Sequence, residues 1–104
     1  MALRPPGNLS ANSLAETGFD ALGYEILAEK AAALGRAGER AEICLRRLKQ
    51  HEHGAEGRTA LVREAAEAVY AWFIQRELCG LRRHDDVIRE YAIPKEVLVR
   101  LGAK

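Results

Sequence analysis

The sequence has few cysteines, few prolines and almost no net charge. Two cysteines in 104 residues are too few for a disulfide framework, so we expect a reduced, cytoplasmic protein. A net charge of +1 provides no strong field for nucleic acid or a membrane surface. No apolar run approaches the roughly 20 residues that span a bilayer, and the N-terminus lacks the apolar segment of a secretory signal.

What is present indicates one small helical domain. Apolar residues make up 48% and charged residues 30% of the chain, a composition typical of a soluble globular protein. Residues 1–17 hold Pro5, Pro6 and scattered leucines, and we expect a flexible arm there. Residues 18–104 form the expected domain. No segment alternates with period two for long enough to be a strand.

A heptad pattern predicts a long first helix. Two capping boxes could open this helix, Ser13–Glu16 and Thr17–Asp20, and the second lies next to the sustained pattern. Residues 51–57 contain two glycines and predict the turn that ends the helix. Spacings of three and four residues indicate a helix packed lengthwise on another helix. The pattern runs through Tyr24, Leu27, Ala31, Leu34, Gly38, Ala41, Leu45 and Leu48.

A second helix is expected from a cap at Thr59 to about Cys79, with Gly80 as the residue after its end. Its residues 69–74 are apolar all round, which indicates burial on every side. Two short helices should follow, over 86–91 and 94–101. The predicted fold is all-α: a long antiparallel helical hairpin plus two short C-terminal helices.

The hairpin geometry predicts which residues face each other. If the helices fold back near residue 54 or 55, facing positions sum to roughly 109, because both helices rise equally per residue. Trp72 then meets the small residues near Gly38, which permits close approach. Cys44 falls near residue 65 and Cys79 near residue 30, too far apart for a disulfide.

The chain has more apolar surface than one helical seam can bury. We therefore expect a homodimer of hairpins with a four-helix core. The alternative is a monomer closed by its own C-terminal helices. The expected interaction surface consists of Tyr70, Phe73, Ile74, Leu22 and Ile26.

Motifs that carry chemistry are weak in this sequence. It has no nucleophile elbow, P-loop or dinucleotide fingerprint, so we assign no catalytic residue and no cofactor. The spacing of His51 and His53 resembles a metal site but is more typical of a solvated loop, and we assign no metal. A polar site is possible at Glu77, Arg82, Arg83 and His84, where Arg76 could supply a further cation. The C-terminus of one helix favours cations and the N-terminus of the next favours acids, so these charged residues can be explained without a bound ligand.

Residues 85–101 have the length of a helix-turn-helix with its turn at Ala92 and Ile93. The second helix would expose only Lys95, Glu96 and Arg100, a poor basic face for reading DNA. Nucleic-acid binding is therefore an alternative to the interaction module, which is the favoured function. A small ligand-binding protein at the Glu77–His84 end is the other alternative.

Four stretches of the sequence resemble a family of short bacterial proteins of unknown function. The resemblance covers about residues 18–103. It implies a small cytoplasmic bacterial protein, and it brings no activity, cofactor or catalytic residue. The stretches are Gly18–Lys30, Ala33–Gly38, Phe73–Leu81 and Tyr91–Leu98.

Overall fold

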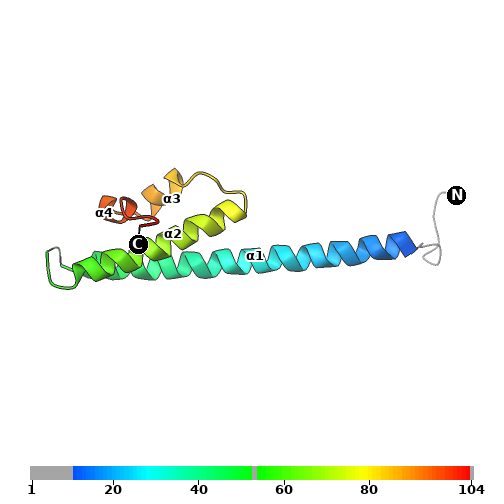
Figure 1. Cartoon of the computed structure of the whole chain (residues 1–104), viewed down its shortest axis with the longest axis horizontal. Coiled ribbons are helices and arrows are strands. Elements are labelled where there is room, and N and C mark those ends of the chain that lie inside the picture. Colours follow the sequence, from blue (N-terminus) through cyan, green and yellow to red (C-terminus); the bar gives the residue numbers. More distant parts are fainter. Residues whose placement is uncertain (1–10, 53, 104) are drawn as a thin grey trace.

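The computed structural model describes residues 11–52 and 54–103, with side chains from residue 18 onward. The chain forms four helices and, over these residues, no strand (Figure 1). The expected all-α fold is confirmed: two long helices pack as an antiparallel hairpin, and two short helices follow. The helices are α1 (Ala11–Gln50), α2 (Arg58–Leu78), α3 (Asp85–Glu90) and α4 (Lys95–Leu98).

Helix α1 has 40 residues and is therefore about 60 Å long. It begins at Ala11, so neither of the two expected capping boxes opens it. Residues 11–17 contain no proline and no glycine, and nothing in their composition stops the helix from extending through them. The expected arm thus overlaps α1 from residue 11, and its residues 1–10 lie outside the described part of the chain.

The turn between α1 and α2 lies where the two glycines predict it. Gly54 and Gly57 have φ values of 84° and 88°, in the left-handed region that favours glycine. Gly57, rather than Thr59, is the residue that precedes α2. The Nε2–H group of His51 donates a hydrogen bond to the carbonyl of Glu56 at 2.9 Å and closes the turn.

Helix α2 ends in a Schellman motif at the predicted glycine. Gly80 has φ 88°, and its amide donates to the Glu77 carbonyl at 3.0 Å. The Leu81 amide donates to the Arg76 carbonyl at 2.8 Å. This motif turns the chain away from α1.

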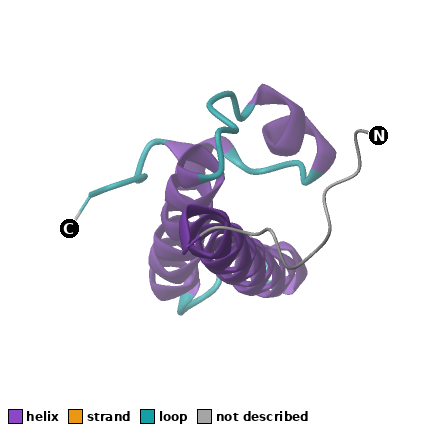
Figure 2. Ribbon diagram, turned by 90° about the vertical axis from the view of Figure 1, so that its right-hand side faces the viewer, coloured by secondary structure: helices purple, strands orange, loops and turns teal. Residues whose placement is uncertain are grey.

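Helix α2 packs against both α1 and α4, and the two short helices lie on one side of the hairpin (Figures 1 and 2). The expected register is confirmed at two points. A β carbon on Gly38 would lie 3.0 Å from Trp72 Nε1, and Cys79 Sγ lies 3.9 Å from the Lys30 carbonyl oxygen. Both cysteines are free thiols, as predicted. The core includes the fully buried residues Ala41, Ala65, Val69 and Val97.

The C-terminal segment contains less helix than expected. His84 precedes α3, so Asp85 is its first residue rather than its cap. The predicted turn is present, with Ala92 at φ 48° and the Ile93 amide bonded to the Ile88 carbonyl at 3.0 Å. Helix α4 follows Pro94 and has only 4 residues, and its Val97 is fully buried in the core.

Much of α1 extends beyond its partner. Helix α2 has 21 residues and is about 32 Å long, roughly half the length of α1. Because Cys79 contacts Lys30, α2 reaches no further along α1 than about residue 30, and the N-terminal part of α1 projects past it (Figure 1). The radius of gyration is 21.4 Å, against about 13 Å for a compact domain of about 100 residues.

None of the described helices combines the length and the apolar character that crossing a membrane requires.

Candidate functional site

The expected polar site lies where α2 ends and α3 begins. His84 Nε2 lies 2.9 Å from Glu77 Oε2, and Arg76 Nε donates to His84 Nδ1 at 3.1 Å. The structure thus brings together Glu77 and His84, as the sequence predicts. It does not bring in the side chains of Arg82 and Arg83, which are exposed. Arg83 contributes only its carbonyl oxygen.

The hydrogen bonds define the state of the imidazole in this cluster. The Nε of Arg76 can only donate, so Nδ1 of His84 accepts and carries no proton. The proton is then on Nε2, which donates to Glu77. The ring also stacks on Phe73, with centroids 4.1 Å apart and planes 7° from parallel. Both ring nitrogens and one ring face of His84 are therefore already occupied within the chain.

Arg76 is the centre of the cluster. Its side chain lies in the core, and the residue is 9% exposed. Its Nη2 donates to the Arg83 carbonyl at 3.0 Å and lies 3.5 Å from Asp86 Oδ1. A buried guanidinium needs such partners because desolvation disfavours a free charge. The cluster holds the α2–α3 turn in place, which favours the interpretation without a ligand.

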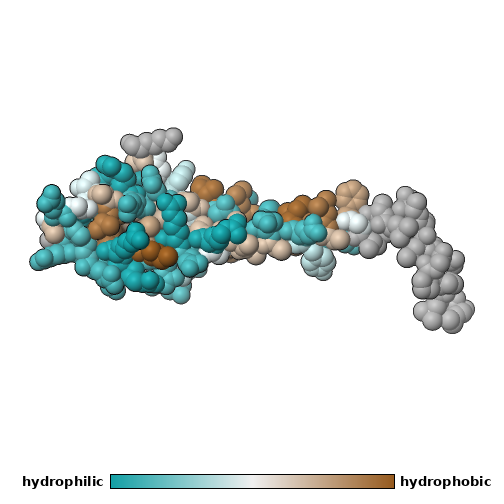
Figure 3. Space-filling model, turned by 90° about the horizontal axis from the view of Figure 1, so that it is seen from below, coloured by the Kyte–Doolittle hydropathy of each residue, from teal (hydrophilic) through white to brown (hydrophobic). Residues whose placement is uncertain are grey.

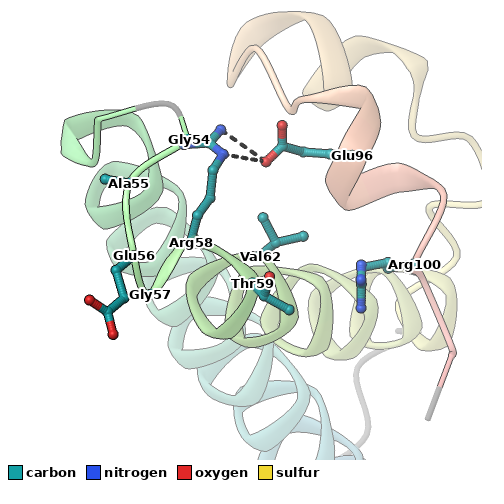
Figure 4. A pocket seen from close by; sticks show the side chains of 9 residues that line it. All are labelled: Gly54, Ala55, Glu56, Gly57, Arg58, Thr59, Val62, Glu96 and Arg100. Carbon is teal, nitrogen blue, oxygen red and sulfur yellow. Dashed lines mark hydrogen bonds and ion pairs between the residues drawn. The ribbon is translucent and has the colours of Figure 1, made fainter.

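A cleft of about 490 Å³ lies between the hairpin turn and α4 (Figure 4). Arg58 and Glu96 bridge it, with Nε and Nη2 of Arg58 at 3.0 and 2.9 Å from Glu96 Oε1. Because each of these charges is neutralised by the other, neither offers a strong site for a charged ligand. The pair instead fastens α4 to the start of α2, a contact across 38 residues of sequence that local patterns do not reveal.

The remaining sequence candidates for ligand chemistry lose support in the structure. His53 lies outside the described residues, and Nε2 of His51 is used by the Glu56 carbonyl. Within the described ranges no three His, Cys, Asp or Glu side chains gather as a metal site would require. Helix α4 is about 6 Å long, a single turn, which is too short to place several side chains on base edges.

Large apolar side chains are also exposed on the projecting part of α1. We call four of them the α1 stripe: Phe19, Leu22, Ile26 and Leu27. Leu27 is seven residues before Leu34, which packs on the core, so Leu27 continues the face that α2 covers further along. Phe19 is 73% and Ile26 49% exposed. Figure 3 shows hydrophobic surface along this part of α1.

Four of the five residues expected to form an interaction surface are exposed, and the surface itself stays a prediction. Leu22 and Ile26 belong to the α1 stripe, and Tyr70 and Ile74 are exposed on α2. Phe73 was wrongly placed on that surface: it is 6% exposed, because His84 stacks on it and it packs beside Trp72. The hydrophobic pattern of the sequence could not reveal this burial, because the side chain that covers Phe73 is the polar imidazole of His84.

Comparisons with known proteins identify the family of the chain but no activity. Neither the curated proteins nor the solved structures include a match to the chain. A model of a family of unknown function, DUF6665, matches residues 1–104, including the first seventeen residues that the sequence resemblance left out. The protein belongs to the DUF6665 family, a family of unknown function.

Proposed function

We propose that the protein is a small helical interaction module that associates with itself, as a homodimer, through the α1 stripe. The observation that supports this proposal is that the heptad face of the α1–α2 seam continues, through Leu27, onto the projecting part of α1. The heptad face of α1 packs on the core from Leu34 to Leu48, whereas Leu27, one heptad before Leu34, is 63% exposed. The sequence pattern does not change where α2 ends, so the exposed part has the composition of a face that is packed.

The energetics favour a partner on this face. Burying a large apolar side chain contributes about 1.5–3 kcal/mol. Four such residues along one face provide enough to offset part of the cost of association, which is several kcal/mol or more. Contiguous apolar surface of this kind on a small protein marks an interaction site.

The other functions considered from the sequence have less support. The polar groups of Arg76, Glu77 and His84 are partnered within the chain. The segment 85–101 contributes Val97 to the core and contains one-turn α4 in place of a recognition helix. A cytoplasmic location belongs to our proposal, since two free thiols suit a reducing compartment.

Sedimentation equilibrium of the full chain tests the proposal. We expect a dimer at concentrations on the order of tens of micromolar, corresponding to association free energies of about −6 to −8 kcal/mol. Ile26→Glu places a charge in the α1 stripe and should weaken the dimer at least tenfold. Ala28→Glu is the matched control, because Ala28 is exposed on the opposite side of the same helical turn. It should leave the dimer intact.

Two results contradict the proposal. One is a wild-type chain that sediments as a monomer throughout this concentration range. The other is a dimer that Ile26→Glu and Ala28→Glu weaken equally, because the stripe would then have no special role.

A further inference from the structure

We propose that His84 is a pH-sensitive switch in the turn between α2 and α3, closed while its imidazole is neutral and opened by protonation. The basis is the direction of one hydrogen bond, which runs from Arg76 Nε to His84 Nδ1 over 3.1 Å. Opening the switch exposes Phe73, which the imidazole covers in the closed state. The switch lies within one chain and does not depend on self-association.

The hydrogen bond between Arg76 and His84 exists only with a neutral imidazole. A guanidinium has donors but no acceptor, so Nδ1 of the imidazole must provide the lone pair. A protonated imidazole carries a hydrogen on both nitrogens and has no lone pair to offer. Protonation therefore replaces this hydrogen bond by a contact between the N–H groups of two cations.

The charged groups around the imidazole come from α2 and α3. Arg76 and Glu77 of α2 bond its two nitrogens, and Asp86 of α3 lies 3.5 Å from Arg76 Nη2. The chain neighbours Arg83 and Asp85 have exposed side chains. Among the residues that the structure describes, no further charged side chain is hydrogen-bonded to the ring.

Burial decides which of these charges governs the protonated state. The side chains of His84 and Arg76 are 13% and 11% exposed, whereas those of Glu77 and Asp86 are 48% and 69% exposed. Solvent screens the two carboxylates but screens the buried pair of cations much less. Repulsion from Arg76 therefore outweighs the attraction that would keep the protonated ring in place. Because Glu77 is on the exposed side, its bond to Nε2 can move outward together with the ring.

Movement of the imidazole uncovers an aromatic side chain of the core. Its ring is stacked on Phe73, which is only 6% exposed in the closed state. The end of α2 stays folded, because the Schellman motif at Gly80 and Leu81 consists of backbone hydrogen bonds that do not involve the ring. Histidine side chains ordinarily change charge between about pH 5 and pH 8, so the switch responds to mild acid.

Nitrogen-15 NMR of the full chain, titrated from about pH 8 to about pH 5, tests the switch. The ring nitrogens of His84 report its protonation, and the Nε–H signal of Arg76 reports the hydrogen bond between them. We expect this signal to be protected from exchange with water at neutral pH and to be lost in step with protonation. His84→Asn is the matched variant, because its side-chain oxygen accepts a hydrogen bond but does not titrate. In that variant the Arg76 signal should persist over the whole range.

His51→Asn is the control for a second histidine, whose ring bonds the Glu56 carbonyl at the other end of α2. This variant should lose the Arg76 signal in acid as the wild type does, and persistence of the signal would assign the effect to the wrong histidine.

Four results in the titration overturn the switch. They are an Arg76 signal that survives protonation of His84, a signal already unprotected at neutral pH, a His84 that stays neutral throughout the titration, and an equal loss in His84→Asn. Acid unfolding of the wild type supports the switch if His84→Asn stays folded, and it contradicts the switch if both chains unfold.

Discussion

Gly38 and Trp72 are in direct contact across the helical hairpin. A β carbon on Gly38 would lie 3.0 Å from the indole Nε1, so α1 approaches α2 here as closely as a glycine allows. The indole is 6% exposed and lies edge-on to Tyr91, with ring centroids 5.0 Å apart. The contact therefore joins α1 to α2, and through Tyr91 to the C-terminal segment.

Gly38→Leu should destabilise the protein by about 1–3 kcal/mol, because a larger side chain overpacks against the indole. Gly35→Leu is the matched control on the same helix, since a β carbon at Gly35 meets nothing within 4 Å. That variant should be neutral or more stable by up to about 1 kcal/mol through helix propensity. Urea unfolding followed by circular dichroism measures both. Equal effects of the two variants would show that the hairpin register is wrong.

Trp72→Ala should cost about 3–5 kcal/mol, because it leaves a cavity between α1, α2 and the ring of Tyr91. Tyr24→Ala removes an aromatic ring that is 75% exposed and should change the free energy of unfolding by less than about 0.5 kcal/mol. Chemical denaturation of both variants checks the difference. A similar loss in both would mean that Trp72 is not packed as described.

Arg76→Leu should destabilise the protein by about 2–3 kcal/mol, because His84 Nδ1 and the Arg83 carbonyl lose their donor. Arg82→Leu removes an exposed guanidinium from the same turn and should stay within about 0.5 kcal/mol of the wild type. Thermal melts at neutral pH compare the two. If Arg82→Leu proves the more damaging variant, the polar cluster is centred on the wrong arginine.

The helical hairpin could be predicted because its signals are local or periodic. The heptad from Leu34 to Leu48 and the small residue at Gly38 were sufficient to place Trp72 opposite it. The same register predicted that Cys79 lies near residue 30, where its sulfur is 3.9 Å from the Lys30 carbonyl. Equal rise on two antiparallel helices makes such a prediction possible once one turn is located.

The candidate site was less predictable because its contacts join separate elements. Glu77 and His84 of the predicted polar site lie together, and of the three arginines that could supply a cation only Arg76 is buried beside them. Which arginine turns inward depends on the Schellman motif, which places the Arg83 carbonyl next to Arg76. The burial of Phe73 depends on the same turn.

The capping patterns in the sequence did not predict where the helices begin. Helix α1 begins before both capping boxes, and α2 begins after a left-handed glycine rather than at Thr59. The short C-terminal helices depend on tertiary contacts, since α4 is held by Val97 in the core and by the pair of Arg58 and Glu96. Such contacts override local propensity.

Amide hydrogen exchange at several protein concentrations tests most directly whether the chain associates with itself through the projecting part of α1. It reports the protection of the amides in that segment itself. We predict that the amides of residues 19–30 are protected at concentrations where the chain is dimeric and exchange rapidly on dilution. The amides of residues 34–48 should stay protected at both concentrations, because α2 covers them within one chain. Rapid exchange of residues 19–30 in a sample that sediments as a dimer would contradict the account.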